Sequence, residues 1–460
     1  MNRINLLTSL IFLLLCYLSE AQEKQKFTIA EAQQYAEENN KQLENARRDI
    51  MMAEQEHKAA LGQGLPQVSG TMDYMTNFNY EAELEFGSGD ADPPQVDYTK
   101  FDPGDYELLK ILNSFSSSGP TTIEMTDQAN AQLQVSQLIF SGQYWVGLQT
   151  ANIGYELARQ NAKITALDVK ETVTNTYQLI LVTREIVDIL DKNLQNLEEI
   201  KTHTNNMYAA GMAEQTDVDQ ISISISKLEN QKKSLERNVN ISYNMLKYQM
   251  GLNNDQEIIL TDSLNGILDH LEAASSLAKA FEIHQNPNYQ IIETQTQLQE
   301  KMVDMQKWAY APTITGFYSY TEKIMTTGFD LSPNNAAGLT LNVPIFSSGI
   351  RKAELEKARI ELDKSQRNKE MVREQLRLQN NQLRYELSSA LENYNTQKQN
   401  VTVAKRVLES IQNKYKQGLV SSLDLTQANT NYLTAESDYL NAALELMQAN
   451  LELKKLYNEI

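Results

Sequence analysis

Acidic side chains follow two glycine-containing turns, and their type and spacing suit a chemical task. Asp217 and Asp219 come after Gly211, and Asp424 comes after Gly418. Carboxylates gathered around a pore form rings of negative charge that attract cations. An Asp just after a turn can instead cap a helix, because its side chain accepts a hydrogen bond from a free backbone N–H. Both roles stay open for Asp217 and Asp424.

No other residues form a pattern that suggests catalysis. The sequence lacks a nucleophile elbow, a phosphate-binding glycine loop and a zinc-protease motif. The formal net charge of −19 argues against nucleic acid, which binds proteins through Lys and Arg. We therefore expect a protein that is not an enzyme, with no catalytic residue, no cofactor, no metal site and no nucleic-acid partner. The histidines lack metal-ligand spacing; they are His57, His203, His270 and His284.

The first 21 residues have the features of a secretory signal peptide. Arg3 precedes an apolar stretch over 4–18, and Ser19-Glu20-Ala21 has the small-x-small form of a cleavage site. A lipoprotein anchor at Cys16 is the alternative, although the bulky Leu15 does not suit it. The rest of the chain contains no cysteine and no run of 18 apolar residues. An exported chain of this kind is either soluble or crosses a membrane as β-strands.

Four landmarks recur in the same order in both halves of the chain. They are a helix opening that leads to Asn, an x-Pro pair, an apolar strand end, and a Tyr-x-x-Gly turn followed by Asp. Their agreement in register predicts an internal duplication. The paired segments are 28–40 and 276–287, 65–66 and 311–312, 138–141 and 344–347, and 208–218 and 415–425.

Each repeat is expected to contain two strands, a long helix and a shorter helix. Residues 351–417 contain neither Gly nor Pro, which predicts a helix of roughly 100 Å. Apolar residues at 401, 404, 408, 411 and 415 predict a coiled-coil seam. The first repeat is predicted over 22–251, with strands at 67–80 and 129–139, a loop at 81–128 and helices at 143–210 and 219–250. The second is predicted over 286–460, with strands at 313–322 and 337–346 and helices at 350–417 and 425–458, after a linker at 252–285.

The predicted strands alternate in polarity along their length. Val68, Met72 and Tyr74 fall on one face of the first strand, with polar residues between them. About ten residues suffice for a tilted strand to cross a bilayer, although a half-buried sheet of a soluble domain shows the same alternation. Four strands cannot close a barrel, and open edges are not tolerated in lipid. A membrane role therefore requires several copies that pool their strands.

The loop at 81–128 is long and acidic, with eleven acids against Lys100 and Lys110. Long loops of membrane barrels commonly lie on the outside of the cell. We therefore expect this loop on the exterior side, together with the shorter loop of the second repeat.

The chain resembles the TolC-like outer membrane efflux proteins in four features. They are the duplication, Asn286-Pro287, the run from Pro344 to Gly349 and the turn that ends at Gly418. The resemblance implies a mainly α fold of long coiled-coil hairpins with a transmembrane β-barrel contribution. It implies a homotrimer in outer membrane lipid, in which twelve strands close one barrel and the helices form a tunnel into the periplasm. It further implies an equatorial collar around the linker, and docking on a periplasmic adaptor and an inner-membrane pump.

The resemblance also assigns roles to individual residues. Gly211 and Gly418 match the turn glycines that contact the adaptor. Val420 and Gln427 stand where the best-known member has an arginine and a second acid, so the ionic latch of the family is expected to be built differently here. The residues expected at the gate of the tunnel tip are Tyr208, Thr216, Asp217, Asp219, Tyr415, Asp424 and Gln427.

Three functions remain open on the sequence alone. The first is a passive exit duct in a tripartite efflux system. The second is the outer-membrane component of type I protein secretion, which uses the same fold. The third, of a different class, is a periplasmic coiled-coil scaffold without a pore, which would explain the long helices but not the duplicated alternating strands.

Overall fold

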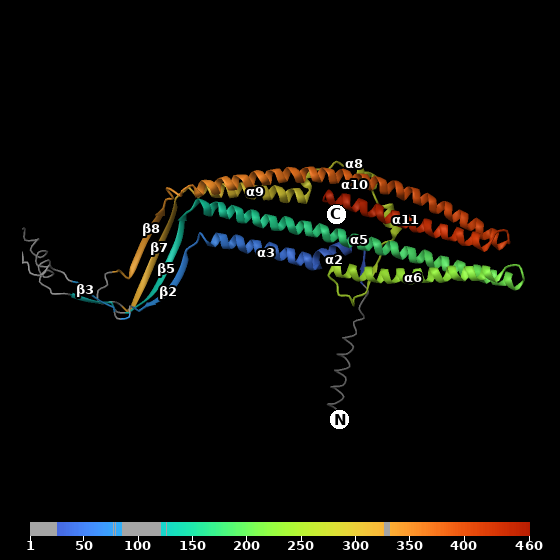
Figure 1. Cartoon of the computed structure of the whole chain (residues 1–460), viewed down its shortest axis with the longest axis horizontal. Helices are drawn as coiled ribbons and strands as arrows, with labels where there is room; N and C mark the ends of the chain where they lie inside the picture. Colours follow the sequence, from blue (N-terminus) through green and yellow to red (C-terminus); the bar gives the residue numbers. More distant parts are fainter. Residues whose placement is uncertain (1–24, 77, 79, 85–120, 126, 326–331) are drawn as a thin grey trace, which may run out of the picture. The chain divides into compact units, whose positions relative to one another are not determined.

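The computed structural model describes residues 25–76, 78, 80–84, 121–125, 127–325 and 332–460 (Figure 1). The predicted signal peptide at 1–21 and residues 85–120 of the predicted acidic loop lie outside this part of the chain. Two compact units are present. The helical unit comprises Met1–Gln55, Asn152–Glu300 and Arg359–Ile460, and the sheet unit comprises Glu56–Ala151 and Lys301–Ala358. Each unit therefore combines segments from both sequence repeats.

Two long helical hairpins dominate the helical unit. The first consists of α5 (Gly142–Ala209) and α6 (Gln215–Met250), and the second of α10 (Ile350–Lys416) and α11 (Ser422–Leu456). The 68 residues of α5 and the 67 of α10 correspond to about 100 Å each at about 1.5 Å per residue. The continuous long helices predicted from the sequence are therefore present.

The two hairpins share an apolar core. Leu408 and Tyr415 of α10, which belong to the predicted seam, are buried together with Leu190 and Leu197 of α5. Ile221 of α6 and Leu425 of α11 complete the cluster. Burial of one such aliphatic side chain contributes about 1.5–3 kcal/mol, so this seam fixes the four helices along one another. The predicted coiled-coil packing is confirmed.

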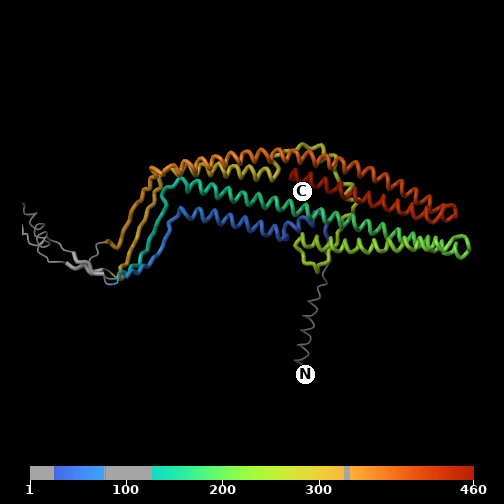
Figure 2. The backbone as a smooth tube through the Cα atoms, in the orientation of Figure 1, coloured from blue at the N-terminus to red at the C-terminus, as the bar shows by residue number. Residues whose placement is uncertain are grey.

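The first helical segment of the chain is divided at Asn40 into α2 (Ile29–Asn39) and α3 (Lys41–Gly62). The Asn40 side chain explains the break. Its Oδ1 accepts hydrogen bonds from the N–H groups of Gln42 at 2.8 Å and Leu43 at 3.2 Å, and its Nδ2 donates to the carbonyl of Gln249 at 2.6 Å. One buried asparagine thus begins α3 and satisfies the last turn of α6, so the two helices meet end to end (Figure 2).

In the second repeat, Asn286 forms the same junction between two helix ends. Its Oδ1 accepts from the N–H groups of Asn288 at 3.0 Å and Tyr289 at 3.2 Å, at the start of α9 (Pro287–Trp308). Its Nδ2 donates to the carbonyl of Leu456 at the end of α11, at 2.9 Å. One asparagine per repeat therefore holds two shorter helices end to end.

Short elements fill the predicted linker at 252–285 and pack against the helices. Strand β6 (Ile258–Leu260) pairs in parallel with β1 (Gln25–Phe27). The fully buried Tyr177 of α5 donates its hydroxyl to the Phe27 carbonyl at 2.8 Å and accepts from the Asp262 N–H at 3.2 Å. This tyrosine fixes both strands to α5. The linker also contains α7 (Leu264–Asp269), α8 (Ala273–Ala278) and the 3₁₀ turn Ile283–Gln285.

The sheet unit holds an antiparallel sheet with the strand order β2-β5-β7-β8. Its two central strands come from different repeats, so each repeat supplies one central strand and one edge strand. The strands are β2 (Gln67–Met75), β5 (Gln128–Phe140), β7 (Thr313–Met325) and β8 (Asn335–Asn342).

The register places apolar and polar side chains on opposite faces of this sheet. Val68, Val135, Tyr318 and Ala337 face one another across the four strands, while Ser69, Gln134, Ser319 and Ala336 alternate with them on the other face. Much of the apolar face is open, since Met72 and Leu339 are 74 % and 75 % exposed. The predicted alternation is confirmed, and it gives an amphipathic sheet rather than a half-buried one.

Two predicted strands end earlier than expected. Strand β2 ends at Met75, because the chain turns at Phe78, which has a φ of 52° and donates its N–H to the Thr76 hydroxyl at 3.3 Å. Strand β8 stops at Asn342 instead of 346, because Pro344 has no N–H to donate to a ladder. The ends of the predicted loop at 81–128 also form a hairpin of their own, β3 (Tyr80–Leu84) with β4 (Thr121–Met125).

Replacing Asn40 or Asn286, which connect the helix ends, should destabilise the helical unit. We expect Asn40→Ala and Asn286→Ala each to lower the free energy of unfolding by about 1–3 kcal/mol, because each loses a cap and leaves a carbonyl unpaired. Asn39→Ala is the control, because this exposed side chain bonds only to the Tyr35 carbonyl of its own helix; its effect should stay within about 0.5 kcal/mol. Urea unfolding followed by circular dichroism measures the difference, and equal losses would contradict the assigned role.

Candidate functional site

The candidate site is the tip of the two hairpins, which we define as residues 204–219 and 415–427. Both turns have the same backbone. Gly211 and Gly418 have φ angles of 76° and 73°, and each donates its N–H to the carbonyl of the tyrosine three residues earlier at 2.9 Å. This is the glycine-terminated end of a helix, in a conformation that favours glycine. Both glycines singled out in the sequence therefore occupy positions where the backbone has a positive φ.

Asp217 and Asp424 cap the helices that follow the turns, but not as the N-cap residues that the sequence suggested. The N-cap positions belong to Glu214 and Ser421, whose backbones are extended. Asp217 Oδ2 accepts the N–H of Glu214 at 3.0 Å, and Asp424 Oδ2 accepts the N–H of Ser421 at 3.0 Å. Each Asp lies one turn further on, where its carboxylate reaches back to the N-cap residue.

Asp424 also keeps its charge. The hydroxyl of Ser421 donates to Asp424 Oδ2 at 2.7 Å. This bond, followed by the one from the Ser421 N–H, holds the pKa of Asp424 below its ordinary value. The exposed carboxylate is therefore ionised at neutral pH. Capping and a role as a surface charge coexist in this residue.

Two hydrogen bonds join one hairpin tip to the other. The hydroxyl of Ser422 on α11 donates to Asp217 Oδ1 on α6 at 2.5 Å. The hydroxyls of Thr204 on α5 and Tyr415 on α10 lie 2.8 Å apart. Both contacts therefore connect side chains of different hairpins. No sequence pattern identifies Thr204 or Ser422, because the role of each side chain depends on which helix lies opposite it.

Tyr415 is placed differently from the other predicted gate residues. Its side chain is 5 % exposed and packs in the shared core of the hairpins, and burial raises the pKa of its hydroxyl. Tyr208, by contrast, is 46 % exposed. The described chain therefore brings Tyr415 into the link between hairpins, while Tyr208 stays on the surface.

The remaining predicted gate residues are exposed and bond within their own helices. The Thr216 hydroxyl donates to Glu214 Oε2 at 3.2 Å, and Asp219 Oδ1 accepts from Gln215 at 2.9 Å. Gln427 donates to Asn431 Oδ1 at 2.8 Å. Together with Asp424 they make an exposed polar surface that carries two carboxylates.

The described residues contain no group of three or more His, Cys, Asp or Glu side chains that could hold a metal ion. The four histidines lie far apart along the chain, as the sequence indicates.

A family comparison matches the second half of the chain. Residues 281–459 match the family described as outer membrane efflux protein. This segment is an outer membrane efflux protein domain. It contains α9, β7, β8, α10 and α11, and it includes the second turn with Gly418 and Asp424. The resemblance to the TolC-like outer membrane efflux proteins is confirmed over these residues.

Solved channel structures share the fold over nearly the whole chain, including the repeat outside the outer membrane efflux protein domain. CusC, described in connection with transmembrane channel formation, superposes with a TM-score of 0.71 at 14 % identity, over 93 % of this chain and 91 % of CusC. The Campylobacter jejuni outer membrane channel CmeC gives 0.68 at 15 %, over 94 % and 85 %. The Neisseria gonorrhoeae outer membrane channel MtrE, in its open state, gives 0.69 at 16 %, over 93 % and 88 %. No curated protein is similar enough in sequence to match.

Within the described ranges, no helix combines the length and apolar character that a membrane-spanning helix needs.

Alanine at the turn glycine and at a helical glycine should have opposite effects. Gly418→Ala is expected to destabilise the tip by about 1–2 kcal/mol, because the turn forces a left-handed backbone. Gly154→Ala, in the N-terminal part of α5, should stabilise that helix by up to about 1 kcal/mol. No atom lies within 4 Å of a Cβ built at either position. Steric clashes therefore do not contribute to the difference in stability between the two variants. Hydrogen exchange of tip amides and urea unfolding measure the two effects, and a neutral Gly418→Ala would contradict the assignment.

Alkaline pH should weaken the link made by Tyr415. Because the folded state raises its pKa, its contribution to stability is complete below the unfolded pKa of about 10 and is lost as pH rises through the higher folded pKa. The free energy of unfolding should therefore fall more between pH 8 and pH 11 in the wild type than in Tyr415→Phe. Tyr208→Phe, at an exposed position, should follow the wild type. The same pH dependence in all three proteins would rule out this role for Tyr415.

Proposed function

We propose that this chain is one protomer of a trimeric outer-membrane channel that serves as the passive exit duct of a tripartite efflux system. The observation that carries the proposal is the amphipathic sheet. Its outer strands, β2 and β8, each pair on one side only within the described part of the chain, and its apolar face is open to the surroundings. Such a sheet is stable in lipid only when its edges are paired.

Three copies satisfy this requirement. Strand direction alternates across β2, β5, β7 and β8, so β8 of one copy can pair antiparallel with β2 of the next around a closed ring. Four strands are fewer than the roughly eight that the smallest membrane barrels use, whereas three copies supply twelve. The family resemblance implies this number.

The helical hairpins would then continue the duct on the periplasmic side. The tip carries a charged Asp424 and an exposed Asp219. Repeated three times around an axis, these carboxylates would form rings that favour cations. The turns at Gly211 and Gly418 are exposed at the far end of the hairpins and offer the contact surface for a periplasmic adaptor, which would connect the duct to an inner-membrane pump.

Mass and conductance together test the proposal. The full-length exported protein, purified in detergent, should have the mass of a trimer and should give discrete conductance steps in planar bilayers. Carbonate should not extract it from membranes. A carbonate-soluble protein without conductance would reject the channel and favour a coiled-coil scaffold.

Asp424→Asn separates charge from capping, because the amide oxygen can still accept the Ser421 N–H. Cation-over-anion selectivity, measured from reversal potentials in a KCl gradient, is expected to fall in this variant while the trimer stays intact. Asp438→Asn is the matched control, because this acid lies on the same helix about 20 Å from Asp424 at about 1.5 Å per residue. Unchanged selectivity in Asp424→Asn would remove Asp424 from the conduction path.

A further inference from the structure

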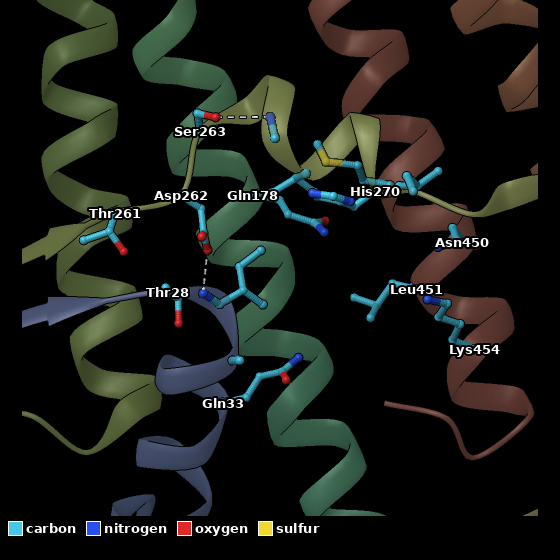
Figure 3. Close-up of a pocket in the computed structure, with 16 residues that line it drawn as sticks. Thr28, Gln33, Gln178, Thr261, Asp262, Ser263, His270, Asn450, Leu451 and Lys454 are labelled. Atoms are coloured by element: carbon cyan, nitrogen blue, oxygen red, sulfur yellow. Dashed lines mark hydrogen bonds between the residues drawn. The ribbon is translucent and has the colours of Figure 1, made fainter.

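A second candidate site lies in the helical unit, apart from the tip. It is a pocket of about 700 Å³ formed by α2, α5, α11 and the segment 261–271 (Figure 3). Pockets of roughly 300–1,000 Å³ suit small molecules. None of the residues assigned to the gate or to the adaptor contact lines it, so the channel function does not account for it.

Two buried carboxamides line this pocket without a partner. Gln178 of α5 and Asn450 of α11 are each 5 % exposed. Gln178 Oε1 and Asn450 Oδ1 are buried without a hydrogen bond within the described part of the chain. Buried polar atoms are nearly always paired in folded proteins, so these two groups point to a missing partner. A carboxamide can rotate to present either its oxygen or its NH₂, and the pair therefore suits a ligand group that both donates and accepts.

The other lining residues define the rest of the ligand. Ile267, Leu271, Met447 and Leu451 give the pocket an apolar wall, which requires an apolar body. Lys454 lines the same pocket (Figure 3) and is partly buried. Its ammonium has no carboxylate partner among the described residues, so it favours an anionic group.

Asp262, the acidic residue that lines the pocket, does not pair with the Lys454 ammonium. Asp262 Oδ2 accepts the N–H of Ile29 at the start of α2, at 2.7 Å (Figure 3). This bond holds the Asp262 carboxylate at the first turn of a helix, where a negative charge is stabilised. The ammonium of Lys454 therefore remains available to a bound anion.

We propose that this pocket binds a small organic anion that carries a secondary amide and a short apolar chain, as an N-acyl amino acid does. The amide N–H and C=O pair with Gln178 and Asn450, the chain packs against the apolar wall, and the carboxylate meets Lys454. All the residues that line the pocket come from one chain.

Calorimetric titration of N-octanoylglycine into the full-length detergent-solubilised protein tests the proposal. Saturable binding of one molecule per chain is expected. Asn450→Leu should weaken it about tenfold, the effect of about one lost hydrogen bond, and Lys454→Gln about fivefold. Octanamide, which lacks the carboxylate, should bind the wild type and Lys454→Gln equally. Absence of binding to the wild type would overturn the proposal.

Asn429→Leu is the matched control for Asn450→Leu. Asn429 lies on the same helix, is 4 % exposed and also has an unpaired Oδ1, but it lines a different pocket. This variant should bind N-octanoylglycine as the wild type does. An equal loss of affinity in both variants would mean that a general disturbance of α11 explains the effect, and the proposed contact would be rejected.

A neighbouring copy is the other possible occupant, and a cysteine label distinguishes it. His270 is exposed at this pocket, and the only native cysteine is Cys16 in the predicted signal peptide. In the assembled protein, His270→Cys should react with a maleimide, and N-octanoylglycine should slow the reaction. Protection of this cysteine in the assembly without added ligand would show that another chain covers the pocket and would overturn the proposal.

Discussion

The structure depends on the satisfaction of backbone hydrogen-bonding groups where its long elements end. A helix leaves about four N–H and four C=O groups unpaired at its ends, and a sheet leaves a row of them along each edge. Asn40 and Asn286 solve the problem within the helical unit, because each side chain serves the end of one helix and the start of the next. The outer edges of β2 and β8 have no partner within the described chain, and the proposed trimer would pair them.

The two repeats meet the same constraint with different side chains. The last turn of α6 is closed by Gly251 at a φ of 78°, whereas the last turn of α11 is closed by Asn458 at 62°. Asparagine is among the few residues besides glycine that adopt this conformation readily. At Gly251 the space is also limited, since an added Cβ would lie 2.2 Å from the Asn39 carbonyl oxygen. At these two helix ends the repeats therefore share the backbone conformation but not the residue type.

At the tip, the same groups serve both structure and the proposed conduction. Asp217 caps α6 and also accepts the Ser422 hydroxyl of the other hairpin, so its carboxylate couples two helices that the sequence places far apart. Asp424 caps α11 and remains exposed. A movement of one hairpin against the other would break the Ser422 and Tyr415 bonds while both caps stay in place. The caps are made within each hairpin and do not depend on these two bonds.

The sequence by itself determined the duplication, the long helices, the turn glycines and the alternating strands, because these follow from local backbone preference and from periods of 3.6 and 2 residues. It could not place the break at Asn40, the burial of Tyr415 or the bonds of Thr204 and Ser422. Nor could it find the unpaired Gln178 and Asn450, which are 272 positions apart in the chain. Only the tertiary structure decided these, because a buried polar side chain takes its role from whichever distant segment packs opposite it.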